Sequence, residues 1–157
     1  MPTYVLDASA LINLKSINLN IGELVTTPKV AEELKDYHVN MVKESGLLKI
    51  YLPSKHYLEK VKQLAEKRGF LARLSSADIE LLALALELKE AGKETILLTD
   101  DYCVQNIAAL LGVSFMPVIR KGIKRVIRRF RYYCPACGHY SAQPTCPYCG
   151  ERCRRIE

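Results

Sequence analysis

Two short cysteine motifs constrain the fold of this 157-residue chain more than any other feature. Cys134-Pro-Ala-Cys137-Gly and Cys146-Pro-Tyr-Cys149-Gly repeat one pattern, in which the glycine allows a tight turn that points backbone amides at sulfur. Four thiolates at this spacing form a closed tetrahedral set of metal ligands. We therefore expect a small rubredoxin-like zinc ribbon with one structural Zn²⁺, which replaces the hydrophobic core that so few residues cannot build.

The positive charge of the chain is concentrated at its C-terminal end. Residues 1–119 contain 13 Lys and Arg against 15 Asp and Glu, whereas residues 120–157 contain 10 against 2. The segment 120–131, RKGIKRVIRRFR, carries seven of these cations and no acid. This composition shift predicts a main domain over 1–119, a basic connector over 120–131, and the ribbon with a basic tail over 132–157.

A basic stretch beside aromatic side chains is typical of nucleic-acid binding, because cations contact phosphates while aromatic rings stack on unpaired bases. Tyr140 fits this role and fits the small core of the ribbon equally well. The candidate RNA-binding residues are Arg120, Lys121, Lys124, Arg125, Arg128, Arg129, Arg131 and Tyr140.

The sequence favours a cytoplasmic protein that does not enter a membrane. No apolar run approaches the roughly 20 residues that span a bilayer, and the start, MPTYVLDASALINL, lacks the basic leader of a signal peptide. Because four of the six cysteines form the paired motifs, metal binding in a reducing compartment is favoured over disulfides.

Strand-like and helix-like segments alternate through the main domain. Apolar runs predict strands over residues 3–7, 23–27, 47–52, 95–99 and 113–118. Helical spacing, serine caps and terminal glycines predict helices over residues 8–16, 28–37, 54–68, 75–91 and 100–112, with a weakly helical segment to about residue 45. This order predicts an α/β fold of three α/β/α layers around a mostly parallel sheet.

Acidic residues follow two of the predicted strands. Asp7 ends the first strand, and Asp100 and Asp101 follow the fourth. Because the carboxyl ends of parallel strands meet at one edge, these acids, with Glu33 and Asp78 on helices, are expected to converge there. Crowded carboxylates repel one another, and their hard oxygen atoms suit Mg²⁺ or Mn²⁺. A divalent metal site is the resulting hypothesis.

Three acids of these segments also have a purely structural interpretation. Asp78 can form a capping box with Ser75, Asp100 can cap the helix that follows it, and Glu32 suits a solvated helix face. Asp7 has no such partner nearby in the sequence, which favours a functional role.

Four segments, VLDASALI, TPKVAEEL, LSSADIELLALAL and ILLTDDYCVQNIA, resemble in order and spacing the PIN-domain ribonucleases over about residues 1–118. The resemblance implies hydrolysis of RNA with carboxylate-held Mg²⁺ or Mn²⁺, leaving 5′-phosphate and 3′-hydroxyl ends. The residues that match the family's acids are Asp7, Glu33, Asp78 and Asp101, with Asp100 as an adjacent candidate and Thr99 and Ser9 as hydroxyls that would orient a carboxylate or water.

The order of the parts, a PIN domain followed by a basic connector and a zinc ribbon, resembles the compact archaeal form of the Nob-type endonuclease family. This resemblance implies cleavage at the 3′ end of the small-subunit ribosomal RNA precursor, with the pre-small-subunit particle as partner. The alternatives are a toxin-type PIN ribonuclease that cuts messenger or transfer RNA, and a non-catalytic assembly factor that only clamps RNA. A phospho-acceptor receiver domain is disfavoured, since no lysine follows the last strand, VSFMPV, at the position such domains require.

The remaining cysteines and histidines are interpreted as structural. Cys103 is expected inside a buried helix and Cys153 as a surface thiol outside the two motifs. His38, His56 and His139 are expected at the surface, so no histidine is placed to act as a general base.

Overall fold

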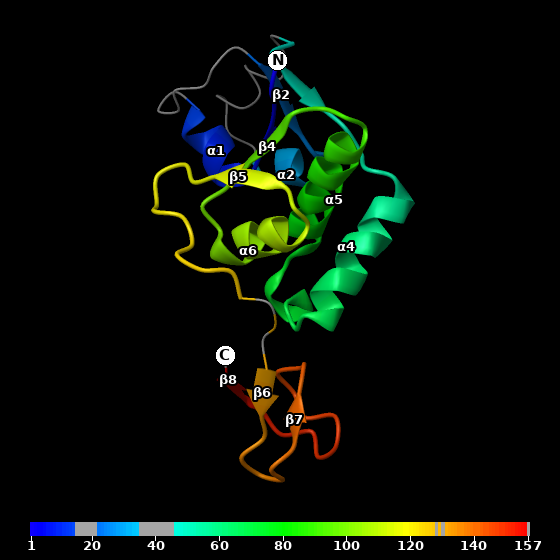
Figure 1. Cartoon of the computed structure of the whole chain (residues 1–157), viewed down its shortest axis with the longest axis vertical. Helices are drawn as coiled ribbons and strands as arrows, with labels where there is room; N and C mark the ends of the chain where they lie inside the picture. The colour runs from blue at the N-terminus through cyan, green and yellow to red at the C-terminus, as the bar shows by residue number, and fades with distance from the viewer. Residues whose placement is uncertain (15–21, 35–45, 128, 130, 157) are drawn as a thin grey trace.

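A five-stranded parallel sheet forms the centre of the main domain. The computed structural model describes residues 1–14, 22–34, 46–127, 129 and 131–156 (Figure 1). The strand order is β3-β2-β1-β4-β5, and every neighbouring pair is parallel. The strands are β1 (Thr3–Leu6), β2 (Glu23–Thr26), β3 (Leu48–Ile50), β4 (Thr95–Leu98) and β5 (Ser114–Met116).

Helices connect these strands and complete the three predicted layers. The chain first moves outward from β1 to β3 and then crosses back to β4 and β5, so right-handed crossovers place helices on both faces of the sheet. α5 packs against β1 and β4, and α4 packs on α5. The helices are α1 (Ala8–Ile12), α2 (Pro28–Glu33), α4 (Lys55–Lys67), the 3₁₀ turn η2 (Leu71–Arg73), α5 (Ser76–Glu90) and α6 (Tyr102–Leu110).

Two helices are shorter than the sequence predicted. α1 was expected to reach residue 16 but ends at Ile12, where Asn13 bonds the Ser9 carbonyl with both its backbone and its side-chain amide. Such local bonding competes with continuation of a helix. α2 was expected to reach residue 37 but ends at Glu33. The weakly helical segment predicted up to about residue 45 lies outside the described residues.

The core lies between the sheet and α5. All four residues of β1 are buried, and so are nine of the first eleven residues of α5. The predicted burial of this helix is thus confirmed. The predicted cap at Ser75 is also confirmed, whereas Ser54 begins α4 without a side-chain hydrogen bond. None of the helices in the described segments has both the length and the apolar composition that crossing a bilayer requires.

The C-terminal residues form a separate three-stranded antiparallel sheet in the order β7-β6-β8, at the end of the molecule opposite the N-terminus (Figure 1). Tyr132 is only 3% exposed and is the buried aromatic residue of this unit. The strands are β6 (Arg131–Tyr133), β7 (Tyr140–Ser141) and β8 (Arg154–Ile156).

The segment between the two units is hydrogen-bonded to α6. The Asn106 side chain donates to the Ile127 carbonyl and accepts from the Ile127 amide, both at 2.6 Å. Beside it, Gln105 accepts from the Ile123 amide at 3.0 Å. Both side chains are buried, so the basic connector is docked on the main domain through paired polar groups.

Candidate active site and metal site

Two of the predicted acids lie at the carboxyl ends of adjacent strands. Asp7 directly follows β1, Asp101 follows β4 by three residues, and the two strands pair with Leu6 opposite Leu98. This is also where the strand order reverses direction, because β1 lies between β2 and β4. Open α/β sheets bind ligands in the crevice at such a point.

The Asp7 carboxylate is held by two donors. Its Oδ1 accepts from the Ala8 amide at 2.7 Å, and its Oδ2 accepts from the Thr99 hydroxyl at 2.5 Å. Burial raises the pKa of Asp7 above its ordinary value, and the charges of Asp101 and Glu33 raise it further, whereas the two hydrogen bonds lower it. Asp7 therefore lies in the field of other acids, as the sequence predicted.

Thr99 connects the two strand-end acids. Its hydroxyl donates to Asp7 and accepts from the backbone amide of Asp101 at 3.1 Å. Its own carbonyl accepts from Gln105 at 2.7 Å, and the residue is fully buried. The structure thus places Thr99 where the sequence expected a hydroxyl that orients a carboxylate.

Asp78 was predicted either to join the acidic metal site or to form a capping box with Ser75, and the structure shows the capping box. Its Oδ2 accepts from the Ser75 amide at 2.9 Å, and its amide donates to the Ser75 hydroxyl at 3.1 Å. Burial raises the pKa of Asp78, and the charges of Asp101 and Asp7 add to this effect. The capping box consequently fixes Asp78 at the start of α5 while leaving it near the other acids.

Glu33 is the exposed last residue of α2 and contributes to the field at Asp7. The residue that positions this helix, Glu80, was not predicted from the sequence. Glu80 is buried on α5, and its Oε1 accepts from the Lys29 amide in the first turn of α2 at 3.0 Å. A lone acid in the apolar run of α5, two residues after Asp78, was the signal that could have identified it.

The expectation that Asp100 caps α6 is wrong. Asp101 is the cap, and its Oδ1 accepts from the Cys103 and Val104 amides at 2.8 and 3.1 Å. The Asp100 carboxylate instead accepts from three successive amides, those of residues 118–120, where the connector begins. A carboxylate turned toward those amides is directed to the connector and away from Asp7.

The donor set at this edge fits a hard divalent cation. Carboxylate oxygens are the ligands that Mg²⁺ and Mn²⁺ prefer, and a cation would relieve the mutual repulsion that raises the Asp7 and Asp78 pKa values. Ser9 lies one residue beyond Ala8, and its buried hydroxyl has no hydrogen-bond partner among the described residues. A buried hydroxyl without a partner is suited to hold a bound water.

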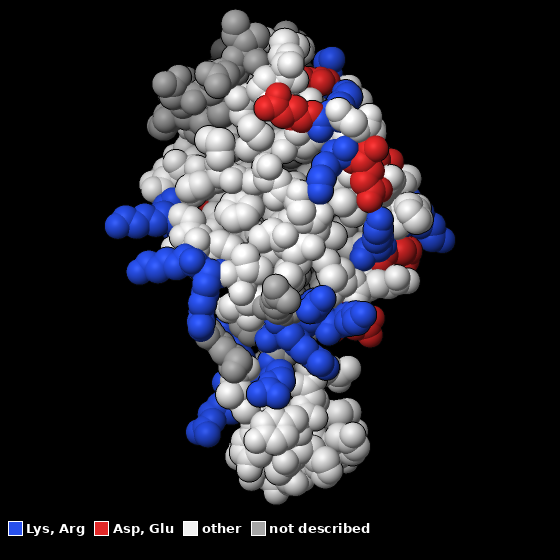
Figure 2. Space-filling model, viewed as in Figure 1, with Lys and Arg blue, Asp and Glu red and all other residues white. Residues whose placement is uncertain are grey.

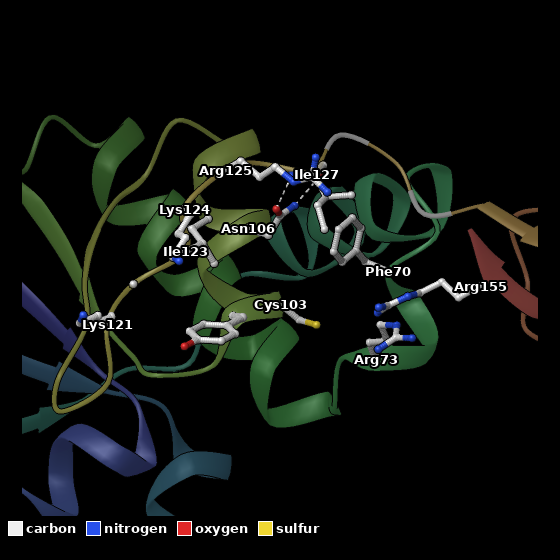
Figure 3. Close-up of a pocket in the computed structure, with 12 residues that line it drawn as sticks. Phe70, Arg73, Cys103, Asn106, Lys121, Ile123, Lys124, Arg125, Ile127 and Arg155 are labelled. Atoms are coloured by element: carbon white, nitrogen blue, oxygen red, sulfur yellow. Dashed lines mark hydrogen bonds between the residues drawn. The ribbon is translucent and has the colours of Figure 1, made fainter. Parts of the chain in front are cut away.

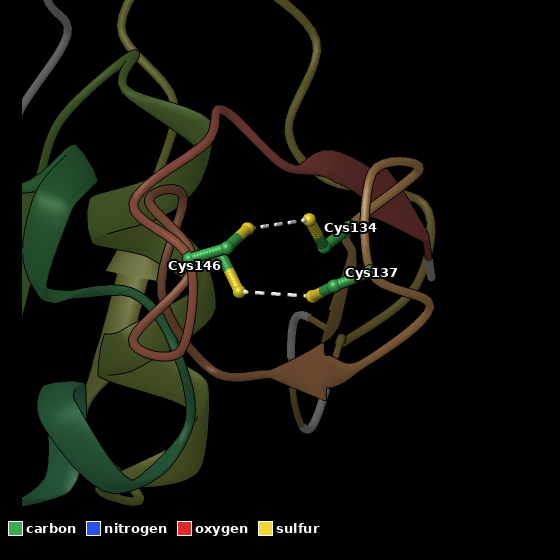
Figure 4. Close-up of side chains that lie close together, drawn as sticks. Cys134, Cys137 and Cys146 are labelled. Atoms are coloured by element: carbon green, nitrogen blue, oxygen red, sulfur yellow. Dashed lines mark hydrogen bonds between the residues drawn. The ribbon is translucent and has the colours of Figure 1, made fainter.

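The four cysteines of the ribbon converge as predicted. Their sulfur atoms all lie within 4.8 Å of one another, and they form the sole such metal-ligand group of Cys, His, Asp or Glu in the part of the chain that the structure describes. Figure 4 shows the labelled thiols of Cys134, Cys137 and Cys146 facing a common centre. The acids at the sheet edge are therefore more widely spaced than the thiols.

Both cysteine turns have the same backbone geometry. Gly138 donates to the Cys134 carbonyl at 2.8 Å and Gly150 to the Cys146 carbonyl at 2.9 Å, and both glycines have φ of +79°. Amides of the turns donate to sulfur, chiefly that of Cys149 to Cys146, which lowers the pKa of Cys146 to about 6. The Cys134 pKa is lowered in the same way, whereas hydrogen bonds to the neighbouring sulfur atoms raise the pKa values of Cys137 and Cys149, so that without a metal the thiolates are concentrated on one cysteine of each turn. Stabilised thiolates are what a zinc site requires.

Comparison with known proteins identifies the family of the chain. Residues 4–88 match the PIN domain of ribonuclease. Endoribonuclease Nob1 of Pyrococcus abyssi is 41% identical over 160 residues, which cover 97% of this chain and 92% of that protein. This chain belongs to the Nob1 family of PIN-domain ribonucleases. Endoribonuclease Nob1 of Archaeoglobus fulgidus is 32% identical and covers 98% of this chain and 92% of its own length. Ribonuclease VapC1 of Thermoplasma acidophilum is 31% identical over 97% of this chain and 77% of its own length.

Many basic residues of this Nob1 family member lie on its surface beside the junction of the PIN domain and ribbon. Figure 2 shows a group of Lys and Arg at this junction, whereas over the rest of the PIN domain on the same face Lys and Arg are mixed with Asp and Glu. Arg128 lies outside the described residues. The exposed connector cations are Arg120, Lys121, Lys124, Arg125, Arg129 and Arg131.

Tyr140 does not form the core of the Nob1-type ribbon. It is 61% exposed, and the guanidinium of Arg131 lies 5.9 Å from the centre of its ring. Exposure leaves the ring accessible for stacking, and RNA contact at this residue remains a prediction. His139 is exposed as expected and stacks on Tyr148 with 4.2 Å between the ring centres.

Cys103 packs against the PIN-domain core, as expected, but is not fully buried. It is half-buried in the first turn of α6 and lines a pocket. Cys153 is half-buried rather than at the surface, and it lies outside the four-thiol group. His56 is exposed, as expected, and His38 lies outside the described residues.

Proposed function

We propose that this protein is a metal-dependent endoribonuclease that cleaves the 3′ end of the small-subunit ribosomal RNA precursor within the pre-small-subunit particle in the cytoplasm. The observation that carries the proposal is the Asp7–Thr99–Asp101 connection at the point where the strand order reverses, with Asp78 and Glu33 in the same electrostatic field. The proposed zinc in the four-cysteine site has a structural role, because four thiolates leave no open coordination position.

A Mg²⁺ or Mn²⁺ ion bound at the acids would supply a water of lowered pKa and would stabilise charge on the scissile phosphate. Among the described residues no three acids form a ligand group of the kind that the four cysteines form, so the acids are not all placed to contact one ion directly. Magnesium commonly uses one or two carboxylates and retains several waters. In this proposal Asp7 and Asp101 are direct ligands, Asp78 and Glu33 hold metal-bound waters, and Ser9 and Thr99 orient water and Asp7.

The choice of ribosomal RNA rests on the family and on the arrangement of the two units. The two relatives named endoribonuclease Nob1 align over nearly the whole of this chain, including the connector and ribbon. The exposed cations of the connector would contact phosphates whatever the base sequence is. The docked connector holds these cations in a fixed position relative to the acids.

The test is cleavage of a small-subunit ribosomal RNA 3′ precursor by the zinc-loaded full chain with Mn²⁺ or Mg²⁺, followed by mapping of both ends at the cut. We expect Asp7→Asn to lower the cleavage rate at least about hundredfold, since losing even a residue that supports a metal ligand costs about 10- to 100-fold. RNA binding should be unchanged, because the basic surface is intact. Cleavage by Asp7→Asn at the parent rate would refute the assignment.

A matched pair of acids on α2 sharpens this test. Glu33→Gln should slow cleavage, while Glu32→Gln should not, because the charge of Glu33 acts on Asp7 and Glu32 is an exposed neighbour on the same helix. Equal effects of the two substitutions would remove Glu33 from the site.

The second candidate function is that of a toxin-type PIN ribonuclease. The alignment of 97% of this chain with ribonuclease VapC1 supports considering this function. The same assay with messenger and transfer RNA separates the two. Preferential cutting of those RNAs would replace the ribosomal proposal. Binding of precursor RNA without cleavage in either metal would instead identify a non-catalytic assembly factor.

A further inference from the structure

A pocket of about 530 Å³ lies between α6, η2 and the connector. Its walls come from three separate parts of the chain: Phe70 and Arg73 near η2, Tyr102 and Cys103 in the first turn of α6, and connector residues 121–125 and Ile127. Arg155 of the ribbon completes it (Figure 3). A volume of this size lies within the range of about 300–1,000 Å³ that is usual for pockets holding small ligands.

The pocket adjoins the acidic site because α6 begins at both, and because η2, which lines the pocket, leads into the start of α5. Tyr102 directly follows Asp101, and Arg73 lies five residues before Asp78. Burial raises the pKa of the Cys103 thiol, and the charges of Asp101 and Asp78 also act on it, while those of Arg73 and Arg155 act in the opposite sense. Cys103 thus lines the pocket two residues after Asp101.

The described residues that line the pocket include cations and no acid. The cations are Arg73, Lys121, Lys124, Arg125 and Arg155. In Figure 3 the side chains of Arg73 and Arg155 point toward one another below the Phe70 ring, and Lys121 lies at the other end of the pocket. Two guanidinium groups that converge in this way form a suitable site for a phosphate, whose oxygens accept from both.

The rest of the lining is apolar and aromatic. Phe70 is buried beneath the pocket, Ile123 and Ile127 form the connector wall, and Tyr102 is 51% exposed at the start of α6. An inorganic phosphate ion gains no binding free energy from contact with this apolar surface. A base attached to a phosphate does, because every base has a flat face that packs on aromatic and aliphatic side chains.

The connector wall is held in place before any ligand binds. Asn106 bonds both backbone groups of Ile127, and Gln105 bonds the amide of Ile123, so the two apolar residues of that wall are fixed to α6. A preformed wall avoids the entropic cost of ordering a loop on binding.

From the size, charge and lining together we propose that this pocket binds one unpaired nucleotide of the RNA, with its base against Tyr102 and its phosphate between Arg73 and Arg155. The proposal rests on the proposed function only in taking RNA as the source of that nucleotide. A nucleotide held next to Asp101 would position the neighbouring phosphodiester bond at the acids.

The test uses the zinc-loaded full chain without Mg²⁺ or Mn²⁺, so that it does not depend on cleavage. Uridine 5′-monophosphate, adenosine 5′-monophosphate, uridine and inorganic phosphate are titrated separately, and backbone amide NMR shifts are followed. We expect the two nucleotides to shift the amides of Tyr102, Cys103 and Ile127, with uridine and phosphate each binding more weakly. A short single-stranded RNA should shift the same amides.

Tyr102→Ala should weaken nucleotide binding about tenfold, which corresponds to about 1.4 kcal/mol and lies within the range for loss of one stacked base. The matched control is Tyr51→Ala, since Tyr51 is 39% exposed, contacts Glu23 and lies outside the pocket. This control should bind like the parent. Tyr102 is half exposed, so its removal leaves the core intact.

Three results would overturn the proposal: no shift of the pocket amides with either nucleotide, equal affinity of Tyr102→Ala and Tyr51→Ala, or inorganic phosphate binding as tightly as the nucleotides. The last would identify a simple anion site. An acidic peptide that competes with the nucleotides and binds more tightly would point to a protein partner instead. Nucleotide binding in the pocket together with absence of RNA cleavage would leave this proposal standing and refute the proposed function.

Discussion

Thr99→Val tests whether one hydroxyl holds the two strand-end acids together. Thr99 is fully buried, and its Oγ1 takes part in two hydrogen bonds, as donor to Asp7 and as acceptor from the Asp101 amide. Valine has nearly the same shape and leaves no cavity. The substitution therefore removes the two bonds and little else.

The loss of stability follows from the character of these bonds. A hydrogen bond to a charged group contributes about 1.5–3 kcal/mol and a neutral one about 0.5–1.5 kcal/mol, so Thr99→Val should lose about 2–4.5 kcal/mol. Thr95→Val is the matched control, because Thr95 is also buried in β4 and its hydroxyl donates once, to the Lys93 carbonyl at 3.1 Å. The control should lose about 0.5–1.5 kcal/mol.

Urea unfolding of the zinc-loaded chain, with and without Mn²⁺, measures both effects. Mn²⁺ should raise the unfolding midpoint of the parent and of Thr95→Val alike, and should raise that of Thr99→Val less, because Asp7 is no longer oriented. Loss of the Thr99 donor also removes a bond that lowers the Asp7 pKa, so the acid limb of the cleavage profile should move to higher pH. If Thr99→Val loses no more stability than Thr95→Val and responds equally to Mn²⁺, Thr99 does not organise the site.

Three further outcomes concern the other parts of the molecule. Chelating zinc or introducing Cys134→Ser should unfold residues 132–150 while the amides of α5 stay protected from hydrogen exchange, because α5 is buried against β1 and β4 whereas the ribbon depends on its four thiols. Loss of α5 protection would contradict this. Replacing Arg125 and Arg129 with Gln should reduce the slope of log affinity for single-stranded RNA against log salt concentration by about 0.7 for each phosphate that is no longer neutralised. An unchanged slope would exclude the connector as an RNA-binding segment. The pKa of Asp7 in the folded protein is raised above its ordinary value of 3.8. The metal-free parent should therefore lose stability as the pH rises from 3.8 through the folded-state pKa. Urea unfolding at a series of pH values should show a smaller loss of stability for Asp7→Asn than for the parent.

The strand-end acids could be predicted from the sequence because their positions depend only on local pattern and general topology. An apolar run followed by an acid places Asp7 at the edge of the sheet, and right-handed crossovers bring the loop after β4 to the same edge. The choice between Asp100 and Asp101 could not be made in this way. Both follow the same strand, and the amides that Asp100 binds belong to residues 118–120, far along the chain.

The docking of the connector was also beyond the sequence, for a related reason. Gln105 and Asn106 sit in the apolar run of α6, where a buried amide is costly unless its partners are present. Those partners are backbone groups of Ile123 and Ile127. Because nearly every residue has the same backbone groups, the sequence RKGIKRVIRRFR does not reveal which of them form these hydrogen bonds. The two amides therefore bind the connector by its backbone and leave its cationic side chains to the surface. The same contacts that Gln105 makes, one to Ile123 and one to the Thr99 carbonyl, join the basic segment to the residue that orients Asp7. Under the proposed function, a phosphate bound on the connector would therefore also determine which bond of the RNA reaches the acids at the sheet edge.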